Sequence, residues 1–147
     1  MSFYTLYQIS AVLSLLGTLA HTFGGMLGTA KRGGVSVPKA DQVFSKMRST
    51  RFKWRGGDTS WFNMWMGNGL GVTALMVPAT VVLWVFAGLP PGIVQSLLPI
   101  VWAIFLSFLG LSLIGFKYFV PRIGIVFGLI ALLTGIAAVR VSFCGGC

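Results

Sequence analysis

The chain contains almost no acidic residues. Among its 147 residues only Asp41 and Asp58 carry a carboxylate, Glu is missing, and all charged residues together make up 9% of the sequence. A soluble domain carries charged residues at about a quarter of its positions, so this composition excludes a soluble protein with an ordinary charged surface. Metal catalysis is also unsupported, because His21 is the only histidine and a metal site needs several such ligands. No metal site is expected.

Hydrophobic residues fill most of the remaining sequence. They make up 56% of the chain, and the mean hydropathy is +0.89. A helix needs about 20 mostly apolar residues to cross a bilayer, and four segments reach that length. We therefore expect an all-α polytopic membrane protein, a single transmembrane domain over residues 1–147 that forms a four-helix transmembrane bundle. The four predicted spans are Phe3–Thr29, Trp61–Ala87, Ile93–Phe116 and Val120–Phe143.

The positive charges lie in two of the connections between these spans. Eight of the eleven Lys and Arg residues lie between Lys31 and Arg55, and two more, Lys117 and Arg122, flank the third connection. The second connection, Gly88–Gly92, has none. Because Lys and Arg stay with cytoplasmic loops, we expect the basic loops in the cytoplasm and both termini outside. This rule accounts for the net charge of +9, so no nucleic-acid partner is expected.

The sequence ends in two cysteines, Cys144 and Cys147. Two thiolates without a nearby histidine are too few for a zinc site. On the expected outer face a disulfide between them is chemically allowed, and a terminal tail with free thiols is the simpler interpretation. The redox state of the pair stays open.

The first connection carries a basic amphipathic segment. Apolar residues recur in Lys39–Trp54 at spacings compatible with one helical face: Val43, Phe44, Met47 and Trp54. The cations interspersed among them are Lys46, Arg48, Arg51, Lys53 and Arg55. Such a segment is suited to lie in the headgroup region, where each cation near an anionic leaflet contributes about 1 kcal/mol. Membrane lipids are the expected partner, and docking to a partner protein is the alternative.

The few polar residues near the cytoplasmic side of the spans form the candidate site. His21 lies about 12 Å from the inner end of the first span, and Asn68 lies about 10 Å into the second, at the rise of an α-helix. Ionisable groups inside a membrane are candidates for function, and a histidine bonded to an amide can act as a general acid or base near neutral pH. His21 is therefore the candidate catalytic residue. The expected ligand-binding residues are His21, Asn63, Asn68, Asp58, Arg51, Trp61 and Trp65.

Two other interpretations of His21 stay open. A neutral histidine bonded to a carbonyl or amide of a neighbouring helix is ordinary in membrane proteins and contributes about 1 kcal/mol to helix association. His21 could instead ligate a cofactor, since a chlorin pigment needs a single axial ligand, whereas a b-type haem usually takes a second. The cofactor is unknown.

Small residues mark faces on which helices can associate. In the fourth span they recur at heptad spacing, which lets another helix approach along its whole length. These residues are Gly124, Gly128, Ala131, Gly135 and Ala138. Glycine-rich faces of this kind fit a homo-oligomer or a subunit of a larger membrane complex.

The segments Ala20-His-Thr-Phe-Gly-Gly25, Met47-Arg-Ser-Thr-Arg-Phe52 and Trp61-Phe-Asn-Met-Trp-Met-Gly-Asn-Gly-Leu70 carry a family resemblance. They resemble a group of small bacterial four-span membrane proteins that is loosely DoxX-like. The resemblance implies a four-span protein of the bacterial inner membrane with a polar cluster on the inner face, and it implies no reaction. Proteins of this group commonly have Asp where Asn63 stands, so this chain lacks the carboxylate that would partner His21.

Together these patterns predict an inner-leaflet polar pocket that binds a lipophilic molecule such as a quinone, an isoprenoid or a lipid. Isomerisation by proton transfer is the least demanding reaction for such a set of residues, and whether the protein is an enzyme stays open. The alternative is a non-catalytic accessory subunit that packs into a larger membrane complex, with a pigment or haem on His21 as one variant.

Overall fold

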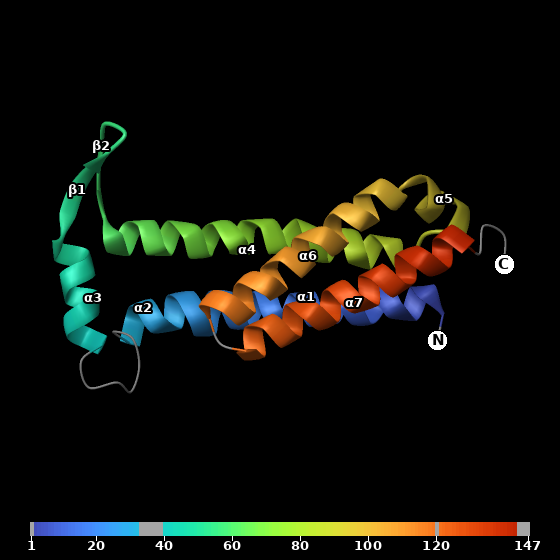
Figure 1. Cartoon of the computed structure of the whole chain (residues 1–147), viewed down its shortest axis with the longest axis horizontal. Helices are drawn as coiled ribbons and strands as arrows, with labels where there is room; N and C mark the ends of the chain where they lie inside the picture. The colour runs from blue at the N-terminus through green and yellow to red at the C-terminus, as the bar shows by residue number, and fades with distance from the viewer. Residues whose placement is uncertain (1, 33–39, 120, 144–147) are drawn as a thin grey trace. The chain divides into compact units, whose positions relative to one another are not determined.

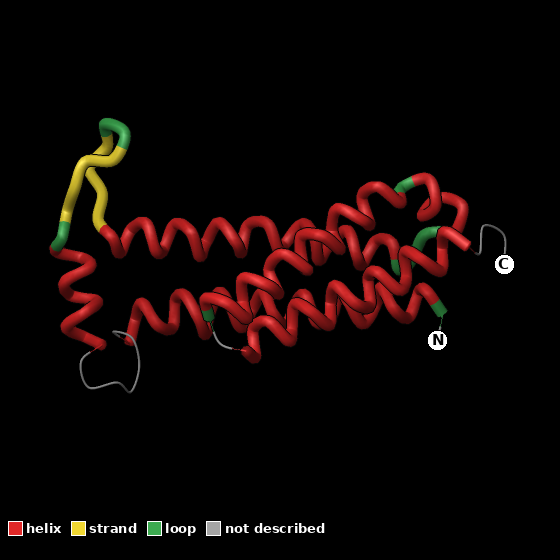
Figure 2. Tube along the Cα trace, in the orientation of Figure 1, coloured by secondary structure: helices red, strands yellow, loops and turns green. Residues whose placement is uncertain are grey.

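The computed structural model describes residues 2–32, 40–119 and 121–143, and most of them are helical (Figures 1 and 2). Four helices are long and apolar enough to cross a membrane: Phe3–Ala30, Trp61–Phe86, Leu98–Tyr118 and Pro121–Phe143. The predicted all-α, four-helix transmembrane fold of an integral membrane protein is confirmed. The predicted cysteine pair, Cys144 and Cys147, lies outside the described residues.

Two compact units divide the chain. The first consists of Met1–Gly17 and Met76–Cys147, and the second of Thr18–Leu75. The boundaries fall inside the first and second spans, so each of these helices contributes residues to both units. The single-domain organisation stays a prediction.

The first span is not a uniform α-helix. It begins as α1 (Phe3–Leu19), continues as the π-helix η1 (Ala20–Leu27) and ends as α2 (Gly28–Arg32). In a π-helix each N–H bonds the carbonyl five residues earlier, and the N–H of Gly28 reaches the carbonyl of Phe23 in this way. A β-carbon on Gly28 would lie 2.5 Å from that oxygen, so this end of η1 accommodates only glycine.

The first connection contains a helix followed by a two-stranded hairpin (Figure 2). α3 runs over Ala40–Ser49, β1 over Arg51–Trp54 and β2 over Gly57–Ser60. The prediction of one helical face that includes Trp54 is wrong, because α3 ends five residues before it. The residues of β1 alternate between basic and aromatic side chains, and a period of two fits a strand rather than a helix.

The hairpin turns through two residues, Arg55 and Gly56, which the strand register leaves between β1 and β2. Both have positive φ, 48° for Arg55 and 88° for Gly56. Positive φ at both central positions is the mark of a type I′ turn, whose twist matches that of paired strands. After the hairpin, the hydroxyl of Ser60 accepts a 3.2 Å hydrogen bond from the N–H of Asn63 and caps the next helix.

Four helices complete the described part of the chain: α4 (Trp61–Phe86), α5 (Pro91–Ser96), α6 (Leu98–Tyr118) and α7 (Pro121–Phe143). The third span, expected as the continuous segment Ile93–Phe116, is interrupted at Leu97. Pro99 explains the interruption, because proline has no N–H to bond the carbonyl four residues earlier and its ring crowds that carbonyl.

α6 and α7 follow each other in sequence and lie side by side in the first unit (Figure 1). Their backbones meet at two glycines, since a β-carbon on Gly115 would lie 2.8 Å from the nitrogen of Gly124. Close by, the hydroxyl of Ser112 donates a 2.8 Å hydrogen bond to the carbonyl of Gly124. The predicted small-residue seam of the fourth span is largely buried, at Gly124, Ala131, Gly135 and Ala138.

Candidate functional site

His21 lies in η1 and contacts the second span. Its Nε2 lies 3.0 Å from the carbonyl oxygen of Gly69 on α4, and its side chain is partly buried. A carbonyl oxygen can only accept, so Nε2 carries the proton and donates it. In the neutral ring Nδ1 then keeps a lone pair. The contact joins η1 to α4 within the second unit and engages one of the two ring nitrogens.

Other side chains fill the space around this hydrogen bond. The hydroxyls of Thr22 and Thr73 lie 2.9 Å apart. Met26 is buried and covers Gly69 so closely that a β-carbon on this glycine would collide with the end of the methionine side chain. The bare backbone at Gly69 therefore lets η1 approach α4 closely, which is the arrangement expected if His21 serves helix association.

In the part of the chain that the structure describes, His21 is not hydrogen-bonded to either asparagine of the predicted cluster. Asn63 and Asn68 are both exposed on α4, and the imidazole bonds the backbone of the residue after Asn68 rather than its amide. Asn63 takes part in the helix cap through its own backbone N–H. Within the described residues, His21 is the member of the predicted polar set whose side chain is hydrogen-bonded at this level.

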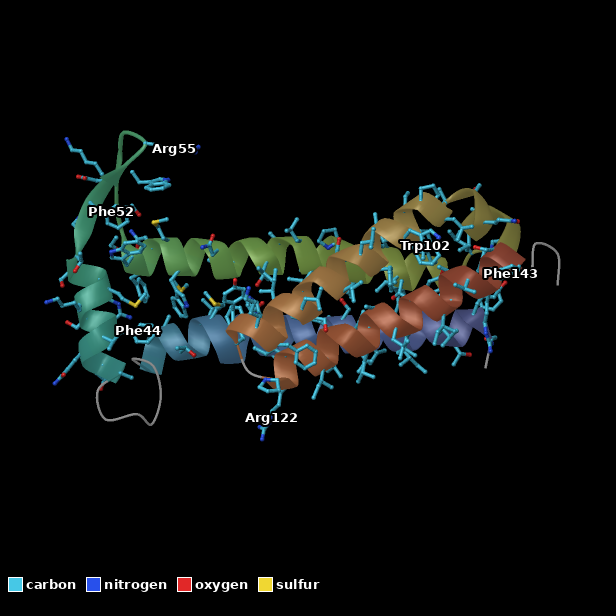
Figure 3. The ribbon with its side chains drawn as sticks, in the orientation of Figure 1. Phe44, Phe52, Arg55, Trp102, Arg122 and Phe143 are labelled. Carbon is cyan, nitrogen blue, oxygen red and sulfur yellow. The ribbon has the colours of Figure 1, made fainter. Side chains whose placement is uncertain are left out.

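An aromatic cluster joins α3 to the beginning of α4 in the second unit (Figure 3). The ring centroids of Phe44 and Trp65 lie 5.4 Å apart, and those of Phe62 and Trp65 lie 5.8 Å apart. The guanidinium carbon of Arg48 lies 4.3 Å from the Phe62 centroid. Its Nη2 also donates a 2.8 Å hydrogen bond to the carbonyl of Ala30 on α2. Trp65 is therefore part of a packed wall, and Arg48 connects α2, α3 and α4.

Trp61, the first residue of α4, packs against the hairpin. The ring centroids of Trp61 and Phe52 lie 4.9 Å apart. Because side chains alternate along a strand, Phe52 and Trp54 share the face of β1 that is turned toward Trp61. Arg51 and Lys53 lie on the opposite face.

Arg51 and Asp58 were expected at the mouth of a site around His21, and both are exposed on the hairpin. In the strand register Arg51 pairs with Ser60, and Asp58 pairs with Lys53. Residues paired across two strands point to the same face. Arg51 and Asp58 are therefore on the basic face of the hairpin, opposite the aromatic one.

A groove with a volume of about 540 Å³ opens beside α3 in the second unit. Its lining residues are Gln42, Val43, Lys46, Met47, Thr50 and Trp61. Val43 and Trp61 are each 55% exposed, so apolar surface is available to a ligand. The volume falls in the range of about 300–1,000 Å³ that is usual for small-molecule sites. Of the predicted site residues, Trp61 alone lines this groove.

No protein-family model, no curated protein and no solved structure matches this chain. The resemblance to DoxX-like proteins therefore stays a prediction, and so does the family's bacterial origin.

The sequence reasoning missed the hairpin, the groove and the role of Arg48. A signal for the hairpin was present, because basic and aromatic residues alternate along β1 and the paired glycines Gly56 and Gly57 follow one residue later. The groove had a weaker signal, since Val43 and Met47 are four residues apart on one face of α3. Nothing in the sequence pointed to the contact of Arg48 with the carbonyl of Ala30.

Proposed function

We propose that this integral membrane protein binds a lipophilic molecule, such as a lipid, a quinone or an isoprenoid, in the groove beside α3. The observation that carries the proposal is the groove itself, with open apolar side chains next to the first residue of a membrane-spanning helix. Tryptophan is enriched at the membrane interface, which places Trp61 where a lipid's tail meets its head. An apolar tail would lie along Val43 and Met47, and a polar head would reach Lys46.

Binding, rather than isomerisation, is the function that this site supports. Among the described residues that line the groove, Lys46 is the one with an ionisable side chain, and proton transfer between two carbons of a substrate needs a positioned acid and base. His21 has Nε2 engaged by Gly69 and belongs to the contact between η1 and α4. Its role in this proposal is to hold α4 in place.

The groove is assigned to the cytoplasmic leaflet. The connection that contains α3 and the hairpin carries eight of the eleven cations, and such connections stay on the cytoplasmic side. In this orientation both termini face the periplasm of a bacterial inner membrane. The cations would also favour a ligand with an anionic head, because each contributes about 1 kcal/mol next to negative charge.

Native mass spectrometry of the protein extracted in a mild detergent tests the proposal. Val43→Trp fills the groove with an apolar side chain and removes no polar group. We therefore expect this variant to lose the lipophilic molecule that co-purifies with the wild type. Leu75→Trp is the matched control, because Leu75 is 74% exposed on α4 and does not line the groove. Retention of the same molecule by both variants would contradict binding in the groove.

A second candidate function is that of a non-catalytic subunit, either in a homo-oligomer or in a larger membrane complex. It is favoured by Gly67 and Gly71, which are exposed one turn apart on α4, with nothing within 4 Å of a β-carbon placed on either. Such a pair lets a partner helix approach closely. Gly67→Leu would break this association in a cross-linking assay and leave ligand binding in the groove unchanged.

A pigment or haem ligated by His21 is a variant of this second function. The protein would then show a visible absorbance band, and His21→Ala would lose it.

A further inference from the structure

The tip of the β1–β2 hairpin combines an aromatic face with a cation in an unfavourable backbone conformation. Phe52 and Trp54 share the face of β1 that packs on Trp61. Trp54 is 56% exposed and Trp61 is 55% exposed, so much of this aromatic surface is uncovered. α4, which begins at Trp61, is long and apolar enough to cross a membrane, so this aromatic surface lies at the end of a membrane-spanning segment. Exposed tryptophans at the end of a membrane span are typical of the interfacial region.

Arg55 occupies the first central position of the turn with φ +48°. The left-handed region is unfavourable for a residue with a β-carbon, and type I′ turns strongly prefer Asn, Asp or Gly there. A residue held in such a conformation points to a function that compensates for the strain. In Figure 3 the Arg55 side chain projects from the tip in the direction in which α4 leaves the hairpin. The guanidinium is thus directed to the same side as the aromatic face.

We infer that Arg55 binds the phosphate of an anionic membrane lipid, with Trp54 seated in the interface beside it. A guanidinium matches phosphate geometry with paired N–H donors, and Arg55 is exposed. The surrounding charge fits this ligand, because Lys46, Arg48, Arg51, Lys53 and Arg55 outnumber Asp41 and Asp58 between residues 40 and 60. The occupant is a lipid of the bilayer that the protein spans. The residues that make this contact, Arg55 and Trp54, do not line the groove beside α3.

Arg51 provides the matched control for Arg55. Both are arginines of the same hairpin and both are exposed, but Arg51 lies on the face away from Trp61. The variants Arg55→Gln and Arg51→Gln remove the same charge and keep a side chain of similar length. A diffuse attraction between the basic connection and the leaflet would respond equally to the two changes, whereas a site at the tip would respond only to Arg55→Gln.

The experiment reconstitutes the full chain in nanodiscs with equal amounts of phosphatidylglycerol and phosphatidylcholine. Native mass spectrometry then ejects the protein from the nanodisc and gives the ratio of bound phosphatidylglycerol to bound phosphatidylcholine. We expect Arg55→Gln to lower this ratio about fivefold, the effect of one cation near anionic lipid, and Arg51→Gln to lower it by less than twofold. Both glutamine variants are also measured in the Val43→Trp background, in which the groove is filled, and the effect of Arg55→Gln should persist there, so failure of the groove proposal would be distinguishable.

Arg55→Gly separates the lipid contact from folding. It removes the cation and the backbone strain together, so hydrogen exchange should show a more protected hairpin while the lipid ratio falls as in Arg55→Gln. An equal fall in the two glutamine variants, or no fall in either, overturns the proposal. Loss of the wild-type preference on addition of soluble glycerol phosphate would also overturn it, because the site would then bind free phosphate rather than a lipid.

Discussion

Replacement of Gly115 by alanine tests the close approach of α6 and α7. A β-carbon on Gly115 would lie 2.8 Å from the nitrogen and 2.9 Å from the Cα of Gly124. Atoms in favourable contact lie about 3.5–4.0 Å apart, so the helices must separate by roughly 1 Å. Backbone atoms cannot rotate away as a side chain can. The separation also weakens the buried hydrogen bond from Ser112 to the carbonyl of Gly124.

The magnitude follows from two opposing effects. Overpacking of a filled core costs about 1–3 kcal/mol, while alanine in place of glycine inside a helix stabilises it by about 1 kcal/mol. Gly110→Ala on the same helix is the matched control, because nothing lies within 4 Å of a β-carbon placed on Gly110. Both variants share the gain in helix propensity. We therefore expect Gly115→Ala to be less stable than Gly110→Ala by about 1–3 kcal/mol.

The assay is reversible unfolding in mixed micelles, followed by circular dichroism as the fraction of SDS rises. The free energies of unfolding of the wild type and the two variants are compared under the same conditions. If Gly115→Ala is as stable as Gly110→Ala, the backbones do not meet at Gly115 and the reasoning is refuted.

Three further predictions concern η1, its contact with α4 and the topology. Gly28→Ala puts a β-carbon 2.5 Å from a carbonyl of its own helix, so hydrogen exchange should accelerate across η1; Gly24→Ala, with nothing within 4 Å, should not change it, and equal rates would contradict the π-helix. Thr22→Val removes a hydroxyl pair with α4 and should lower the free energy of unfolding by about 0.6 kcal/mol. Ser107→Ala, whose hydroxyl bonds its own helix, is the control and should change it less. A reporter fused after Cys147 should be active in the periplasm, and activity in the cytoplasm would reverse the assigned orientation.

The four spans were predictable because each is a long apolar segment, and apolar length is the main requirement for crossing a bilayer. Structural details that depend on single residues were not predictable in this way. Hydropathy does not report the interruption at Leu97, which depends on the missing N–H of Pro99 two residues later. It also gives no signal for η1, which depends on the absence of a β-carbon at Gly28 next to the carbonyl of Phe23.

The amphipathic character of the basic connection was predicted from the sequence. The hairpin within it was not predicted. Val43 and Met47 do lie on α3, and adding Trp54 to the same face extended the helical pattern across a strand. The alternation along β1 and the glycine after Arg55 were the competing signals, and turn chemistry decided between them. The hydrogen-bond acceptor of His21 could not be predicted from the sequence, for a different reason. Residue types show which side chains could bond, whereas the acceptor is the backbone carbonyl of Gly69.

Photocross-linking in the native membrane tests most directly whether the groove binds a specific lipophilic molecule. A diazirine-bearing amino acid is placed at Val43, inside the groove, and in a separate variant at Leu75, on the exposed surface of α4. Adducts are identified by mass spectrometry after illumination. The account predicts a single class of lipophilic adduct at Val43 and a mixture that follows the bulk lipid composition at Leu75. The same bulk mixture at both positions would contradict it.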